Sequence, residues 1–185
     1  MITKISKKFF ILTLLLSIML LTSCAKSLWL GSKLSDKATK QQQEQVKQEV
    51  MELLEKEYNQ PFKLLNYKYE YKRHYDLGGN CHYCDVVKYG TYYFKVQALD
   101  NPIIVMDFRI DDINKSSTSE LIEGFKKDLL ANLYCGIGVA DYYIKVRKEK
   151  IVVDHENLEK AEKYCQSRNQ QEQYTFFKKT YEKAK

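Results

Sequence analysis

The stretch from Phe62 to Tyr75 constrains the fold of this chain more than any other feature of its sequence. Tyrosines at positions 67, 69 and 71 alternate with charged residues at positions 68, 70 and 72. A period of two places alternate side chains on opposite faces of a β-strand. The tyrosines could form a stacking platform for a sugar or a base, but the interpretation we favour is the buried face of an antiparallel sheet that is wet on its other face.

Two further segments continue this sheet. Turn-forming residues at 76–80 and 100–102 separate strands that we predict over 86–99 and 103–110. Three successive strands of this kind indicate an antiparallel meander. One more strand is predicted within 139–153, with residues 143, 145, 147 and 149 on one face and residues 144 and 146 on the other.

Helical periodicity flanks the strands. Residues 36–59 carry an apolar stripe at positions 46, 50, 53 and 54, and Pro61 ends the helix that this stripe predicts. Ser117 and Glu120 have the spacing of a capping box, which predicts the start of a second helix. Its apolar positions are 121, 125, 129 and 133, and we expect it to end near Cys135-Gly136. Residues 157–183 have a helical but strongly polar composition.

These elements predict an α+β fold. A long N-terminal helix and a second helix would pack on one face of a small antiparallel sheet, followed by a polar C-terminal helix. The order of elements is similar to that of cystatins and of nuclear-transport-factor-like folds, and folds of this kind host many functions. We predict an α+β domain over 36–155 and a C-terminal helical segment over 156–185.

The first residues of the chain follow the pattern of a secretory signal. Lysines at positions 4, 7 and 8 precede thirteen nearly all apolar residues over 9–21, and the small residues Thr22 and Ser23 follow. A membrane-spanning helix needs roughly 20 apolar residues, so this run favours a cleaved signal over an uncleaved anchor. We predict that residues 1–23 are removed.

The end of this run, Leu21-Thr22-Ser23-Cys24, resembles the lipobox of bacterial lipoproteins, in which a peptidase cuts just before the cysteine. The resemblance implies diacylglycerol on the sulfur of Cys24 and, in many species, acylation of its amino group. Two or three acyl chains hold a protein stably on a membrane, whereas one holds it only reversibly. We therefore expect a lipid anchor and tether over 24–35. The expected location is the exported face of the cell membrane or, because Ala25 is compatible with it, of the outer membrane.

Removal of the signal changes the charge balance. The full chain has 30 basic and 24 acidic residues, and loss of three lysines leaves 27 against 24, a net charge of +3. The basic pI therefore partly reflects the signal and does not indicate a nucleic-acid partner. The chain has only two prolines and seven glycines, and this low number argues against a disordered chain. The length that remains after removal of the signal suits one domain.

Four cysteines remain besides Cys24, at positions 81, 84, 135 and 165. An exported chain meets an oxidising compartment, in which an even number of cysteines favours disulfides. We expect a local Cys81–Cys84 bridge and a Cys135–Cys165 bridge between the second helix and the C-terminal one. Four cysteines allow three pairings, and the sequence leaves all three open.

The stretch Cys81-His82-Tyr83-Cys84 has two alternatives to a local disulfide. Its two-residue spacing is that of a redox dithiol, but reactive dithiols sit at the start of a helix, and this motif lies between a turn and a strand. A metal site could use the two cysteines with His74 or His82. A strong zinc signature needs a second pair of ligands at matching spacing, and His155 is far away in the sequence.

No catalytic constellation stands out. Acidic residues at 107, 111 and 112 are interpreted as a turn before the second helix, and Gly136 and Gly138 lack the third glycine of a phosphate loop. We therefore expect a membrane-held binding or interaction module rather than an enzyme, without cofactor or metal and with an envelope protein as partner. Its signature would be an exposed apolar or aromatic patch. The alternative is a thiol-redox or metal-binding envelope protein centred on Cys81 and Cys84.

Overall fold

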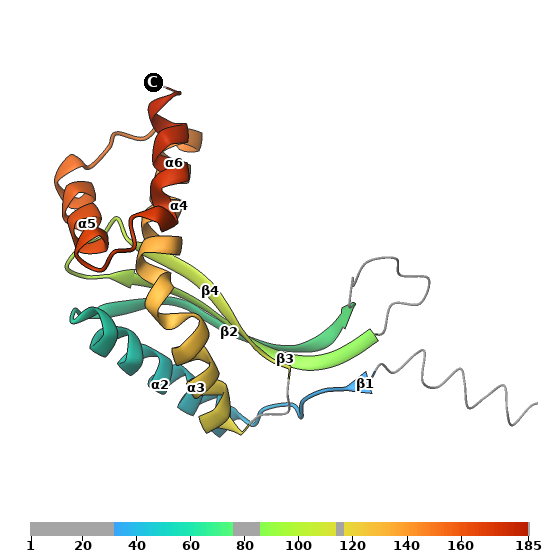
Figure 1. Ribbon diagram of the computed structural model, residues 1–185. Helices are drawn as coiled ribbons and strands as arrows, with labels where there is room; N and C mark the ends of the chain where they lie inside the picture. Colours follow the sequence, from blue (N-terminus) through green and yellow to red (C-terminus); the bar gives the residue numbers. More distant parts are fainter. Residues whose placement is uncertain (1–31, 76–85, 114–116, 185) are drawn as a thin grey trace, which may run out of the picture.

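The computed structural model describes residues 32–75, 86–113 and 117–184 and confirms the α+β fold (Figure 1). Helices α2 and α3 cover one face of the sheet, and the C-terminal helices gather at one of its ends. The elements are β1 (Ser32–Lys33), α2 (Lys40–Tyr58), β2 (Phe62–Tyr75), β3 (Val86–Ala98), β4 (Val105–Asp112), α3 (Thr118–Asp128), the 3-10 turn η1 (Leu130–Asn132), the π-helix η2 (Leu133–Val139), α4 (Ala140–Glu149), α5 (His155–Ser167) and α6 (Glu172–Glu182).

Strand β3 lies at the centre of the sheet. It pairs in antiparallel fashion with β2 along one edge and with β4 along the other, which confirms the predicted meander. The third strand runs over 105–112 instead of 103–110, because the N–H of Ile104 donates to the carbonyl of Asn101 in a turn. Beyond the end of β4, the short strand β1 pairs in parallel with Val87 and Lys88 of β3. Residues 32–33 of the expected tether are therefore part of the sheet.

A β-bulge at Leu65 decides which face the tyrosines occupy. Leu64 pairs with Val96 and Asn66 pairs with Lys95, so Leu65 is an extra residue in β2. One extra residue reverses the alternation of side chains. We define the inner face as the face of the sheet that α2 and α3 cover (Figure 1). It therefore carries Phe62 and Leu64 before the bulge and the tyrosines at 67, 69 and 71 after it. The opposite face is the outer face.

The core forms between the inner face and the two covering helices. Both helices begin with a complete capping box, Thr39 with Gln42 for α2 and Ser117 with Glu120 for α3, and the second confirms the prediction. The rings of Phe94, Phe108 and Phe125 stack in succession from β3 through β4 to α3, with centroids 5.2 and 5.7 Å apart. The helices bury one stripe each, namely Val46, Val50, Leu54 and Tyr58 of α2 and Leu121, Ile122 and Phe125 of α3.

The chain after α3 differs from the prediction. Helix α3 ends at Asp128, but helical structure continues through η1 and η2 past Cys135-Gly136 into α4, where a strand was predicted. That prediction was wrong because the buried residues Val139, Tyr142, Tyr143 and Val146 recur at intervals of three and four. Tyrosine and the β-branched residues favour strands locally, and burial of this helical stripe overrides that preference.

A glycine allows η2 to lie close against the sheet. A Cβ atom at Gly138 would stand 2.6 Å from Cγ2 of Ile104 and 3.4 Å from Cγ of Met106. Only glycine fits at this contact, so its presence lets η2 pack directly on the start of β4. Beyond it, α4 reaches Lys150, whose left-handed backbone (φ 52°) ends the helix.

The C-terminal segment is two helices rather than one. Asn169, with φ 56°, lies in the break between α5 and α6. Cys135 of η2 and Cys165 of α5 form a disulfide, which confirms this predicted bridge. Both cysteines are fully buried. Within the described ranges, no helix combines the length and the apolar character needed to cross a membrane.

The tyrosine row holds the segment that leads into α2. The hydroxyl of Tyr71 donates to the carbonyl of Ser35 (3.0 Å), and the hydroxyl of Tyr67 donates to the carbonyl of Gln43 (2.8 Å). Between them, the N–H of Ala38 donates to the hydroxyl of Tyr69 (2.8 Å). Burial raises the pKa of Tyr67 to about 12. These rings are half-buried and their hydroxyls are engaged, so the row acts as a packing surface for the chain itself.

Candidate binding groove

An open groove of about 760 Å³ lies in the angle between the outer face of the sheet and α4. Strands β2, β3 and β4 supply one wall, α4 supplies the other, and the segment after α4 extends it. The lining residues are Leu65, Lys95, Gln97, Pro102, Ile103, Val105, Asp107, Asp141, Tyr142, Ile144, Lys145, Lys148, Glu149, Ile151, Val152 and Asp154.

Exposed apolar side chains concentrate in this groove. Leu65 is 41% exposed, Ile151 is 37% exposed and Val152 is 94% exposed. They are three of the six large apolar side chains that are exposed within the described residues, and the other three are scattered. The bulge supplies Leu65, and the left-handed turn at Lys150 supplies the other two. A cluster of this kind on a largely polar surface indicates an interaction site.

The carboxylate of Asp107 acts on that of Asp141 across the groove. Asp107 projects from the outer face of β4, and Asp141 lies in the first turn of α4. Burial raises the pKa of Asp141, the carboxylate of Asp107 raises it further, and Lys148 lowers it. Lys95 stands directly opposite Asp107 in the ladder between β3 and β4. A cation placed between the two carboxylates by a partner would relieve their repulsion.

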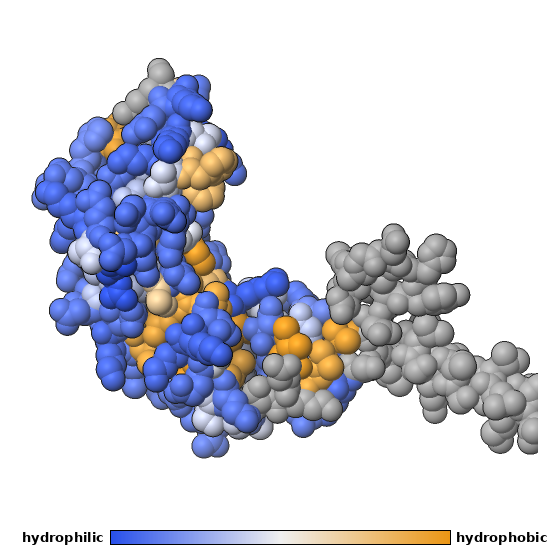
Figure 2. All heavy atoms as spheres, in the orientation of Figure 1, coloured by the Kyte–Doolittle hydropathy of each residue, from blue (hydrophilic) through white to orange (hydrophobic). Residues whose placement is uncertain are grey.

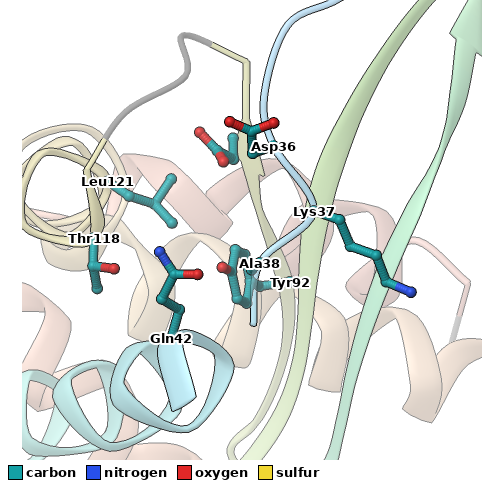
Figure 3. Close-up of a pocket in the computed structure, with 8 residues that line it drawn as sticks. Asp36, Lys37, Ala38, Gln42, Tyr92, Thr118 and Leu121 are labelled. Atoms are coloured by element: carbon teal, nitrogen blue, oxygen red, sulfur yellow. The ribbon is translucent and has the colours of Figure 1, made fainter. Parts of the chain in front are cut away.

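A smaller cavity of about 160 Å³ lies where the N-terminal segment, α2 and α3 meet the sheet (Figure 3). Asp36, Gln42, Thr118 and Leu121 line it, whereas the side chain of Lys37 points away from it. Its polar groups serve the fold, because Gln42 accepts the N–H of Thr39 in the capping box (2.9 Å) and Asp36 pairs with Lys33. This cavity is therefore a weaker candidate than the groove.

A third hollow lies between α2 and α3. The view in Figure 2 is mostly hydrophilic, and hydrophobic residues gather over the region of these two helices. Leu53 and Ile122 lie in this hollow with charged residues around them, and both pack against the core. The hollow is thus the seam between two covering helices.

The structure describes some of the site residues predicted from the sequence and not others. Cys24, Cys81, Cys84 and His82 lie outside the described residues. The ring of His74 stacks on Tyr89 with centroids 3.6 Å apart, and His155 is the exposed first residue of α5. In the described parts of the chain, no three His, Cys, Asp or Glu residues are placed to hold a metal ion.

The acidic residues at 107, 111 and 112 belong to β4 rather than to a turn. The strand alternates buried and more exposed positions through to its end, so Asp107 and Asp111 face outward while Asp112 faces inward. Asp111 accepts a hydrogen bond from Thr91 (2.8 Å) and pairs with Arg109 (3.1 Å). The interpretation as a turn was therefore wrong. Asp107 and Asp111 fit the outer face of a sheet that is open to water on that side, and Asp112 is the last residue of the strand.

The groove is not indicated by the sequence alone. Ile151-Val152-Val153 is an apolar run after several charged residues, and it falls at the end of the strand predicted within 139–153. The bulge that turns Leu65 outward has no signal in the sequence. Comparisons with models of known protein families, with curated proteins and with solved structures found no match. The geometry of the groove is thus the basis for a functional proposal.

Proposed function

We propose that this protein is a lipid-anchored, non-enzymatic binding module of the bacterial cell envelope, which holds a segment of a partner protein in the groove beside α4. The observation that carries the proposal is the cluster of Leu65, Ile151 and Val152, exposed together on an open groove. No serine, cysteine or histidine is among the described residues that line the groove, so they include no Ser–His or Cys–His pair.

The groove favours an extended peptide that carries apolar side chains and a cation. Its apolar residues lie on two walls, which suits a segment that presents side chains to both. Asp107 and Asp141 stand where a lysine or arginine of the partner would bind. Charge complementarity of this kind contributes to specificity and to the rate of association.

Synthetic ten-residue peptides that alternate apolar residues with lysine or arginine are expected to bind the mature protein and to perturb the backbone amide signals of α4 and β4. The substitution Val152→Ser should weaken this binding by about tenfold, because it removes an exposed apolar anchor from the groove. Titration followed by NMR or by fluorescence anisotropy measures the effect.

The matched control is Phe176→Ser, which removes an exposed apolar side chain of α6 outside the groove. This variant should bind the basic peptides as the parent protein does. A second peptide set with glutamate in place of lysine and arginine tests the charge preference, which Asp107→Asn should weaken. Equal binding of both sets, or equal loss in the two serine variants, would contradict the groove as the docking site.

The proposed anchor has its own test. Expression of the full precursor in a bacterium should give a membrane-extracted product that lacks residues 1–23 and carries added lipid mass on Cys24. Alkylation before reduction should label no cysteine if Cys81 and Cys84 form the second disulfide. Intact mass spectrometry measures both results. Absence of lipid would contradict the anchor, and two alkylated cysteines would favour the thiol-redox or metal-binding alternative.

A further inference from the structure

Three basic side chains form a row across three adjacent strands. Lys88 of β3 stands directly opposite Lys33 of β1 on one side and directly opposite Arg73 of β2 on the other. Residues that pair directly across strands project from the same face of the sheet, with Cβ atoms roughly 4.5–5.5 Å apart. Lys33 and Arg73 are exposed and Lys88 is half-buried. We call these three residues the cationic row.

The described residues supply little charge to compensate the cationic row. Asp36 pairs with Lys33, but both side chains are more than half exposed, and such a pair exchanges readily with other ions. The ammonium of Lys88 lies 4.7 Å from the centre of the Tyr71 ring. Within the described residues, neither Lys88 nor Arg73 has a carboxylate within ion-pair distance. Like charges that face each other across strands destabilise a sheet, so this arrangement favours a bound anion.

The cationic row lies at the end of the sheet where the chain emerges from its N-terminal tether. Lys33 is in β1, and Figure 1 shows β1 at the end of the sheet opposite to the C-terminal helices. Only residues 25–31 separate Cys24 from β1. Fully extended, this tether keeps β1 within about 29 Å of the lipid anchor. A domain tethered this closely samples contact with the bilayer continually.

We propose that the cationic row binds the phosphate groups of anionic lipids and thereby docks this end of the sheet on the membrane. The inference rests on the proposed anchor at Cys24. Basic groups next to an anionic leaflet are attracted over roughly one Debye length, about 8 Å at physiological salt. Docking in this orientation points the groove beside α4, at the far end of the sheet, away from the membrane and toward its partner.

Lysine acetylation tests this docking on the full chain as the bacterium processes it. The extracted protein is reconstituted into vesicles of phosphatidylcholine alone and into vesicles with about 30% phosphatidylglycerol. Lys33 and Lys88 should be acetylated about fivefold more slowly in the anionic vesicles, and 0.5 M salt should remove the protection. Lys145 and Lys148 in the groove serve as internal controls and should react equally in both.

The variant Arg73→Gln should lower the protection of Lys33 and Lys88, whereas the matched variant Lys145→Gln should leave it unchanged. Equal acetylation in both kinds of vesicle, with the protein attached to both, would overturn the proposal, as would protection that soluble phosphate reproduces on neutral vesicles. Failure to float with neutral vesicles is a different result, because it contradicts the anchor at Cys24 and with it this inference.

Discussion

Replacement of both Cys135 and Cys165 by alanine is expected to lower the free energy of unfolding by about 3–4 kcal/mol. The disulfide closes a loop with a sequence separation of 30 residues, and a cross-link of this length removes much of the entropy of the unfolded chain. It also holds α5 against η2 at a fully buried position. Denaturant unfolding followed by circular dichroism measures the change.

Reduction of the parent protein is the control for this prediction, because it breaks the same bond without changing the side chains. The alanine variant and the reduced parent should then differ only by the packing of two small groups and by any second bridge. Further destabilisation of the alanine variant on reduction would report a disulfide between Cys81 and Cys84. A loss below about 1 kcal/mol in the variant would show that the C-terminal helices hold their place without the cross-link.

The substitution Tyr58→Phe is expected to cost about 1–3 kcal/mol of unfolding free energy. Tyr58 is the last residue of α2 and is 3% exposed. Its hydroxyl donates to the carbonyl of Leu130 in η1 and accepts the N–H of Tyr134 in η2 (3.1 Å). Phenylalanine keeps the ring but leaves two buried backbone groups without this partner, and thermal and urea unfolding measure the result.

Tyr164→Phe is the matched control. The ring of Tyr164 packs against those of Tyr58 and Tyr134, with centroids 6.3 and 4.7 Å away. Its hydroxyl oxygen is buried and has no hydrogen bond of normal geometry with the described residues, and Arg168 lies beside it. Removal of that oxygen should therefore change the stability by less than about 0.5 kcal/mol. A similar loss in both variants would mean that the hydroxyl of Tyr58 contributes little beyond its ring.

The sequence predicts the sheet well because its alternation is local. Strand β2 has the bounds that the tyrosine pattern indicates, and β3 differs from its prediction by one residue. The start of α3 follows from Ser117 and Glu120, since a capping box involves neighbouring residues only. The pattern also indicates that the tyrosines face the core side, but the reversal of alternation at Leu65 depends on pairing with β3 and has no local signal.

Prediction fails where the outcome depends on contacts between distant segments. Residues 139–153 contain enough tyrosine, valine and isoleucine to favour a strand. Residues 140–149 nevertheless form α4, because η2 is held on β4 through Gly138 and on α5 through Cys135. The groove depends on the same contacts. Its exposed apolar side chains come from the bulge in β2 and from the segment after α4, which only the tertiary fold brings together.

The attachment of β1 and the tyrosine row also has a mechanical consequence. If a tether pulls on the chain ahead of Ser32, the force first reaches the pairing of β1 with Val87 and Lys88 of β3. It then reaches the bond from the N–H of Leu34 to the carbonyl of Lys88 (2.8 Å). It next reaches the bonds of Tyr71 with Ser35 and of Tyr69 with Ala38. All of these bonds lie ahead of α2, which begins at Lys40. These hydrogen bonds must break before the pulling force reaches α2 and the core that it covers.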